Sequence, residues 1–157
     1  MNNQKHSRFS LTVCVFCLLA TSTWAQEDRW AYPPDIRDAE TKVYKTASGA
    51  DLKMWVYNPP GWKSSDKKPA IVFFFGGGWW RGSPKQFVEH ARYLASRGMV
   101  ALLADYRVSS RHETGGEACV EDAKSAVRWI RANASKLGVD PAKVVAAGES
   151  AGGHIAA

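Results

Sequence analysis

A serine lies at the centre of the sequence Gly148-Glu149-Ser150-Ala151-Gly152, and this spacing of small residues suits acyl-transfer chemistry. The apolar run 144–147 precedes it and residues 155–157 can begin a helix, which gives the strand, turn and helix context of a nucleophilic serine. A tight turn of this kind holds the serine in a strained conformation that exposes its hydroxyl. Side chains at positions 148 and 152 would crowd the neighbouring strand and helix, which explains the two glycines. We therefore predict that Ser150 is a nucleophile.

A second candidate element is the glycine loop Gly76-Gly77-Gly78, which follows the apolar run 70–75. A loop without side chains can offer backbone N–H groups to an oxygen that becomes negatively charged. We assign such donors to Gly77 and Gly78, with the N–H of Ala151 as the third. A plain glycine turn is the alternative for either motif alone. Because each motif directly follows an apolar run, the pair favours the catalytic interpretation.

The apolar pattern predicts the elements that position these motifs. It predicts strands at 41–46, 52–57, 70–75, 99–104 and 144–147, with helices at 84–97 and 117–137. The first two strands form a hairpin, and the remaining strands alternate with helices. Such alternation is typical of an α/β fold, in which a mostly parallel sheet carries helices on both faces. Reactive groups in such sheets collect at the carboxyl ends of the strands, where both motifs fall.

The first 25 residues have the pattern of a secretory signal peptide. Lys5 and Arg8 precede an apolar run over 9–20, and cleavage is expected after Ala25. The run is shorter than the roughly 20 residues that cross a membrane. We expect a secreted or periplasmic protein with no membrane span after cleavage, in which residues 26–40 form an extended arm over the surface.

Charge and composition exclude some classes of protein. Removing Lys5 and Arg8 with the leader lowers the net charge from +6 to +4, since 19 Lys and Arg then face 15 Asp and Glu. This modest surplus argues against a nucleic-acid partner. The 45% of hydrophobic residues suffices for a buried core. Cys119 is the one cysteine after the leader, and it is predicted to be buried on a helix face or to pair with a cysteine beyond residue 157.

Together the two motifs resemble the hormone-sensitive-lipase-like and carbohydrate-esterase (BD-FAE-like) branches of the α/β-hydrolase superfamily. Those branches carry His-Gly-Gly-Gly-Trp followed by Gly-Asp/Glu-Ser-Ala-Gly-Gly-His, and Asp105-Tyr106-Arg107 is also similar to a segment of that group. The resemblance covers about 53–157 and implies an α/β-hydrolase fold with Ser150 as nucleophile. It also implies oxyanion-hole donors at Gly77, Gly78 and Ala151. The sequence departs from the pattern at Phe75, where a histidine usually braces the loop through hydrogen bonds.

The resemblance also implies a catalytic acid and a histidine after the serine, but only seven residues follow Ser150. We therefore expect 41–157 to be the N-terminal portion of a hydrolase domain, nearly inactive alone because the serine has no base. His154 is expected to be a packing residue, and Asp122 a solvated or ion-paired one. His90 and His112 are expected at the surface.

The predicted activity is cleavage of carboxylic esters through an acyl-enzyme, with no metal or cofactor. The substrate would be a small-molecule or polysaccharide ester, and the resemblance and the export signal favour acetyl or feruloyl esters on polysaccharide. Trp79, Trp80 and Arg81 beside the loop could line its pocket or pack in the core. One alternative is a prolyl-oligopeptidase-like peptidase or amidase. Another is a non-catalytic binding protein with this fold, and the oligomeric state stays open.

Overall fold

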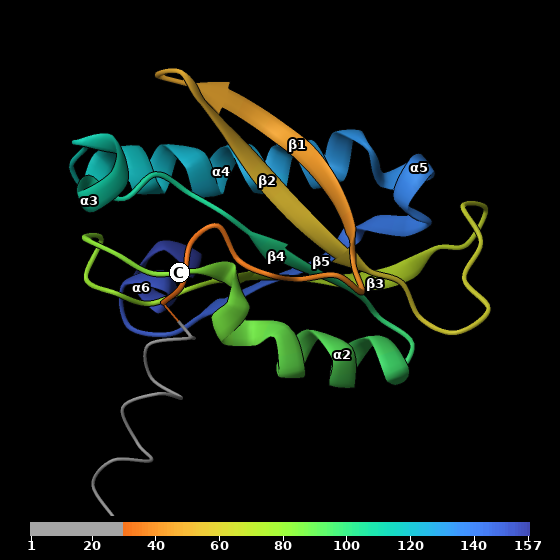
Figure 1. Ribbon diagram of the computed structural model, residues 1–157. Helices are drawn as coiled ribbons and strands as arrows, with labels where there is room; N and C mark the ends of the chain where they lie inside the picture. The colour runs from red at the N-terminus through yellow and green to blue at the C-terminus, as the bar shows by residue number, and fades with distance from the viewer. Residues whose placement is uncertain (1–29) are drawn as a thin grey trace, which may run out of the picture.

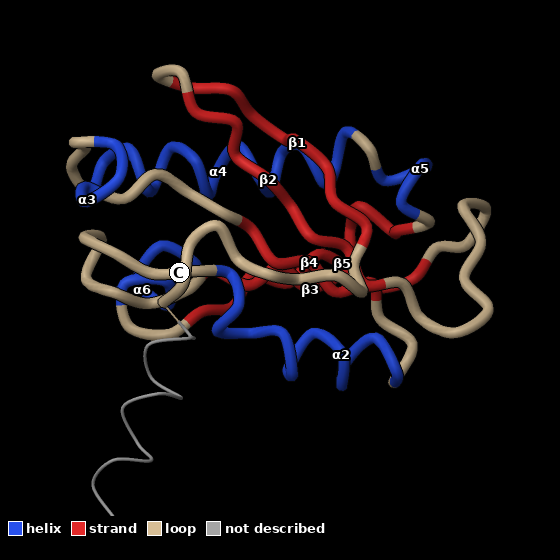
Figure 2. Tube along the Cα trace, in the orientation of Figure 1, coloured by secondary structure: helices blue, strands red, loops and turns tan. Residues whose placement is uncertain are grey.

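The computed structural model describes residues 30–157, in which five strands form one sheet. The predicted signal peptide and the first four residues of the predicted arm lie outside the described residues. The strands are β1 (Glu40–Ala47), β2 (Ala50–Tyr57), β3 (Lys68–Phe74), β4 (Val100–Ala104) and β5 (Val139–Gly148). They lie in the order β1-β2-β4-β3-β5. Figures 1 and 2 show the β1-β2 hairpin rising from the overlapping central strands.

The centre of the sheet is parallel. Val72 of β3 lies opposite Leu102 of β4 on one side and Ala146 of β5 on the other, and both pairings are parallel. The β1-β2 hairpin joins the sheet through an antiparallel pairing of β2 with β4. The expected α/β architecture, a mostly parallel sheet with helices, is confirmed.

Helices cover both faces of this sheet. They are the 3₁₀ helix η1 (Pro84–Phe87), α2 (Val88–Ser96), α3 (Ser109–His112), α4 (Gly116–Ala132), α5 (Ala134–Leu137) and α6 (Ala151–Ala156). Figure 1 shows α2 below the sheet and α4 above it, with α3 and α6 at the end toward which the parallel strands run. Within residues 30–157, no helix is both long and apolar enough to cross a membrane.

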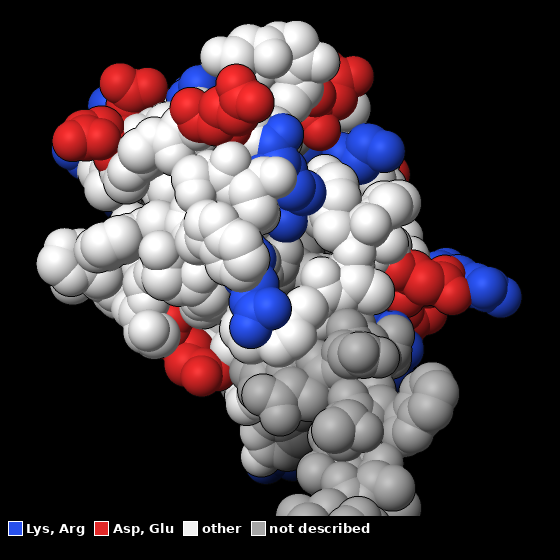
Figure 3. Space-filling view, turned by 60° about the vertical axis from the view of Figure 1, so that its left-hand side comes forward, with Lys and Arg blue, Asp and Glu red and all other residues white. Residues whose placement is uncertain are grey.

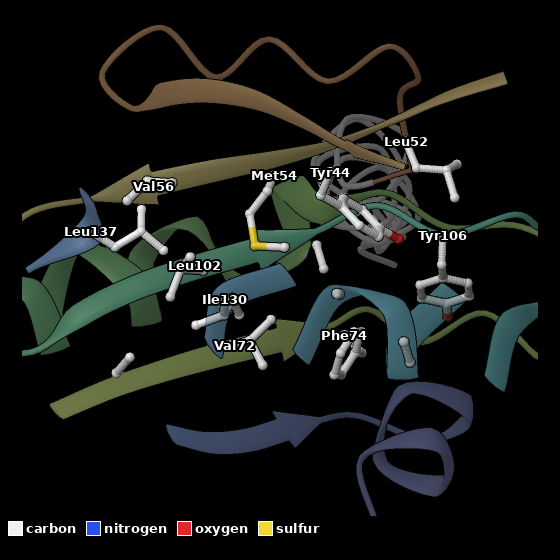
Figure 4. Packing of buried hydrophobic residues seen from close by; sticks show 14 of the residues in the cluster. Tyr44, Leu52, Met54, Val56, Val72, Phe74, Leu102, Tyr106, Ile130 and Leu137 are labelled. Carbon is white, nitrogen blue, oxygen red and sulfur yellow. The ribbon is translucent and has the colours of Figure 1, made fainter. Parts of the chain in front are cut away.

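Alternate residues of each central strand enter two separate cores. Val72 and Leu102 point toward Ile130 of α4, and Figure 4 shows this layer filled by side chains from β2, β3, β4 and α4. Their neighbours Phe73 and Leu103 pack on the other face against η1 and α2. A strand buried on both faces must be apolar throughout, which explains the continuous apolar runs in the sequence.

Two local predictions were wrong. The helix expected at 84–97 begins as the 3₁₀ turn η1, and the helix expected at 117–137 breaks at Asn133. The Asn133 amide donates to the carbonyl of Trp129 at 2.9 Å, a local bond that competes with continuation of the helix. The strand expected at 144–147 is β5, which begins earlier, at Val139, and is the last strand of the sheet in the described residues.

Candidate active site

Ser150 occupies the turn between β5 and α6, and its side chain is exposed. Its backbone has φ 52° and ψ −118°, which is uncommon for a residue with a Cβ. Two hydrogen bonds hold the turn: Gly152 N donates to Glu149 O at 2.8 Å, and His154 N donates to Ser150 O at 2.9 Å. The predicted strand, strained turn and helix are therefore present around this serine.

The glycines on either side of Ser150 are sterically required, as predicted. A Cβ at Gly148 would lie 2.3 Å from the backbone carbon of Gly152 and 2.6 Å from the carbonyl oxygen of Phe74. A Cβ at Gly152 would lie 2.0 Å from the same oxygen. The end of β3 therefore presses directly on the turn, and no side chain fits between them.

The glycine loop lies directly beside Ser150. A Cβ built on Gly76 would lie 2.9 Å from the carbonyl oxygen of Glu149 and 3.5 Å from the Cβ of Ser150. Gly77 has φ 135°, and its carbonyl accepts hydrogen bonds from the N–H groups of Trp80 and Arg81, each at 3.2 Å. The structure thus brings together two motifs that lie about 70 residues apart in the sequence.

The predicted donors differ from their neighbours in how their N–H groups are used. The N–H of Gly76 is occupied, because it donates to the side chain of Gln86 at 2.8 Å. No hydrogen bond from the N–H of Gly77 or Gly78 occurs within the described residues. Ala151 is the first residue of α6, a position whose N–H has no partner inside the helix. Two loop N–H groups and one helix N-terminal N–H without a partner in residues 30–157 thus belong to the two segments that meet where Gly76 approaches Glu149 and Ser150.

Phe75 holds the loop by packing, in the position where the histidine of the resemblance would form hydrogen bonds. Its ring is 1% exposed and stacks on the ring of Tyr106. The Tyr106 hydroxyl donates to the carbonyl oxygen of Phe75 at 2.5 Å. On the other side, a Cβ at Gly82 would lie 2.3 Å from the Phe75 ring, so the chain closes tightly over it.

A buried carboxylate, Asp105, ties the N-terminal arm to this region. Its Oδ2 accepts from the Tyr32 hydroxyl at 2.7 Å, and its Oδ1 accepts from Arg111 at 3.3 Å. The Arg111 guanidinium also covers the Tyr32 ring at 3.8 Å and donates to the carbonyl of Gly82 at 2.7 Å. Burial raises the pKa of Asp105, while the Tyr32 hydrogen bond and the Arg111 charge offset part of that rise. The sequence analysis did not predict these contacts of Tyr32 and Arg111.

The other ionisable candidates take structural positions. The ring of His154 is exposed and meets the face of Trp79 edge-on, with centroids 5.5 Å apart. His90 is exposed on α2, as expected, whereas His112 is half-buried and its Nδ1 accepts from the N–H of Val108 at 3.1 Å. Asp122 is fully buried in an ion pair with Arg107 at 2.8 Å, which confirms the expected ion pairing.

A cavity of about 590 Å³ adjoins the loop. Trp79, whose φ is 60°, and His154 line it together with Val120, Glu117 and Glu121 of α4. Figure 3, which brings this end of the molecule forward, shows a face formed largely by uncharged side chains. Of the three residues considered for a pocket, Trp79 therefore lines one.

The sheet order, the serine turn and the adjoining glycine loop define the class of this protein as an α/β-hydrolase. The model of the BD-FAE family matches residues 54–157, well over half of the sequence, and the chain belongs to that family.

Several relatives of known structure or activity are esterases. The chain is 58% identical to a thermophilic esterase, Est2, from the Planctomycetes species Thermogutta terrifontis, with a TM-score of 0.80 over 82% of this chain and 46% of that one. It is 44% identical over 64 residues to esterase LipC of Mycobacterium tuberculosis, which is 41% of this chain and 15% of that protein. Carboxylesterase NlhH of the same species is 40% identical over 58 residues, 37% of this chain and 18% of that protein. The chain therefore spans less than half the length of these relatives.

Proposed function

We propose that this chain carries the nucleophile and the oxyanion hole of a serine carboxylesterase. The observation that supports this best is the exposed Ser150 in a strained turn, its Cβ 3.5 Å from where a Cβ on Gly76 would lie. Strained backbone persists where function requires it, and here it presents a hydroxyl beside N–H donors. The named esterases among the relatives agree with this chemistry.

In the proposed reaction, Ser150 Oγ attacks the ester carbonyl carbon while its proton passes to a histidine. The carbonyl π electrons move to oxygen, and the N–H groups of Gly77, Gly78 and Ala151 stabilise the resulting oxyanion. The C–O bond to the alcohol then breaks, and the histidine returns the proton to the leaving alkoxide. Water attacks the acyl-enzyme in the same manner and releases the acid and free Ser150.

The histidine and its carboxylate partner are proposed to lie in sequence beyond residue 157. His154 is not suited to the role, since its ring packs on Trp79 and its backbone is fixed in α6. A serine without a base loses several orders of magnitude in rate. The 157 residues by themselves are therefore expected to be nearly inactive.

The proposed substrates are esters with short acyl groups. Structures of Thermogutta terrifontis Est2 include propionate-bound and butyrate-bound forms, at 58% identity to this chain. Export through the leader at 1–25 would bring the enzyme to extracellular material, so acetyl or feruloyl groups on polysaccharide are the proposed natural esters. The exposed indole of Trp80 beside the loop is suited to contact a sugar or a phenolic ring.

The test uses the product of the complete reading frame that contains these residues. Wild type, Ser150→Ala and the control Ser125→Ala are assayed on p-nitrophenyl acetate, p-nitrophenyl butyrate and acetylated xylan. Ser150→Ala is expected to lower kcat by roughly 10⁶-fold. Ser125 is partly exposed on α4, and its hydroxyl donates to the backbone carbonyl of Glu121 within the same helix, so its variant should match wild type. Cleavage of a prolyl p-nitroanilide without ester cleavage would instead favour the peptidase, and an active Ser150→Ala would refute the proposal.

A further inference from the structure

We infer that Gln86 is a positioning residue that fixes the distance between the glycine loop and the serine turn, an inference that rests on the proposed function. Its side-chain Oε1 accepts from the N–H of Gly76 at 2.8 Å, and its Nε2 donates to Oε2 of Glu149. Gly76 begins the loop, and Glu149 immediately precedes Ser150. One side chain therefore spans the two chain segments that would form the oxyanion hole.

A side-chain amide offers both groups that these bonds need, an acceptor oxygen and a donor N–H. The Gly76 N–H donates and the Glu149 carboxylate accepts, so the bridging group must offer one acceptor and one donor. A glutamate at position 86 would accept but not donate, and a lysine would donate but not accept. The two partners therefore suit an uncharged amide better than a glutamate or a lysine at position 86.

Gln86 is itself held in place. It lies in η1, where its N–H donates to the carbonyl of Ser83 at 3.2 Å and the buried Ser83 side chain caps the turn. The next residue, Phe87, stacks on Phe73 of β3 with centroids 4.9 Å apart. A bridge from a fixed turn can hold other segments in register, which a freely rotating surface side chain cannot do.

The bridge also decides which glycines face the substrate. Because Gln86 occupies the Gly76 N–H, the donors left in the loop are those of Gly77 and Gly78. These act with the N–H of Ala151, which lies on the other segment. An oxyanion hole built from two segments stabilises the transition state only while their separation is correct, so loss of the bridge should lower kcat more than it raises KM.

An isosteric exchange of charge tests the inference in the complete protein. Gln86→Glu sets a second carboxylate against Glu149 and should lower kcat for p-nitrophenyl acetate by about 10-fold, less than the roughly 100-fold that follows loss of an oxyanion donor. Adding Glu149→Gln to that variant restores both bonds, because the carboxylate introduced at position 86 then accepts from Gly76 and from the amide introduced at position 149. The double variant should regain most of the wild-type kcat with KM nearly constant throughout. Glu149→Gln alone should have the smaller effect, since its amide oxygen still accepts from Gln86.

Glu89→Gln serves as a control, because it exchanges a carboxylate and an amide of equal size at an exposed position of α2. It should leave kcat unchanged. The rate of inactivation by paraoxon gives a second readout, because Thermogutta terrifontis esterase 2 is known phosphorylated by it. Two results would overturn the role of Gln86 and leave the proposed function intact. In the first, wild type is active and Gln86→Glu has the same kcat. In the second, the double variant is as slow as Gln86→Glu. A wild type that neither cleaves the ester nor reacts with paraoxon would overturn the proposed function and this inference together.

Discussion

The ring of Phe75 lies nearly parallel to the ring of Tyr106, with centroids 4.1 Å apart and 12° between their planes. Tyr106 contacts Phe75 twice, since its hydroxyl also donates to the Phe75 carbonyl. The residue before the glycine loop is thus fixed through its ring and through its backbone. A phenylalanine can hold the loop by packing, without the hydrogen bonds that a histidine would supply.

Replacing Phe75 by leucine should therefore affect both stability and catalysis. Loss of stacking and imperfect repacking are expected to lower the free energy of unfolding by about 1–2 kcal/mol. Kcat should fall by about 10-fold with little change in KM, because the loop donors act on the transition state. Phe73→Leu is the matched control, since Phe73 is also buried and stacked, on Phe87, but faces α2. Urea unfolding and ester kinetics of both variants check this; equal loss of kcat in the two would contradict it.

Within the glycine loop, two neighbouring positions should respond differently to alanine. At Gly77, with φ 135°, a Cβ would lie 1.9 Å from the carbonyl oxygen of Arg81, so the turn cannot form. Gly77→Ala is expected to lower kcat by more than roughly 100-fold. At Gly78, with φ 63°, a Cβ meets nothing within 4 Å. The cost there is the strain of a left-handed residue, about 1–2 kcal/mol. Kinetics and circular dichroism of both variants test the difference, which a fully active Gly77→Ala would disprove.

The hydroxyl of Tyr32 should link the N-terminal arm to catalysis. Tyr32→Phe removes a donor from buried Asp105, at an expected loss of about 1–2 kcal/mol in the free energy of unfolding. Asp105 also accepts from Arg111, which holds the carbonyl of Gly82, so a less fixed Asp105 loosens that contact. A modest fall in kcat, about 2- to 5-fold, is expected because the loop is only indirectly loosened. Both quantities are measured by urea unfolding and ester kinetics.

Tyr57→Phe is the control for the arm. The Tyr57 hydroxyl also donates to a carboxylate, that of Asp38 at 3.0 Å, but Asp38 is exposed and keeps its bond to Arg92. Loss of the Tyr57 hydroxyl should lower the free energy of unfolding by about 0.5 kcal/mol and leave kcat unchanged. If Tyr32→Phe behaves like Tyr57→Phe in both assays, the arm has no part in positioning the loop.

The parts of the site that could be predicted from the sequence are those fixed by local chain geometry. Ser150 and its flanking glycines form one turn, so their types and spacing are sufficient to predict it. The contacts that brace the site are long-range: 73 residues separate Tyr32 from Asp105, and 63 separate Gln86 from Glu149. A glutamine or tyrosine in a polar segment has no local pattern that names its partner, so only the folded chain reveals it.

The helices and strands also differ in how well the sequence predicts them. Periodicity predicted the central strands because both of their faces are buried, which demands apolar residues throughout. It predicted a continuous helix through Asn133 because the spacing of apolar residues contains no information about a side-chain amide that donates to the backbone.

Asp122 should make stability depend on pH in the acid range. Burial alone would raise its pKa, but hydrogen bonds from Arg107 and Lys45 outweigh that effect and hold the pKa below its usual value of 3.8. A carboxyl whose pKa is lowered by folding stabilises the protein above the unfolded value, and this stabilisation is lost as the pH falls through the folded value. Asp122→Asn should cost about 3–5 kcal/mol at pH 7, because it leaves the buried Arg107 without this partner.

The free energy difference between wild type and Asp122→Asn should therefore shrink below about pH 4 and be constant above it. Urea unfolding of the complete protein between pH 3 and pH 7 measures this difference. Glu121→Gln is the control, since Glu121 is 69% exposed and lies 3.5 Å from Arg107, so its loss should cost less than about 0.5 kcal/mol at any pH. A difference for Asp122→Asn that does not change between pH 3 and pH 7 would show that the buried pair does not titrate in this range, and that the loss of stability arises from packing instead.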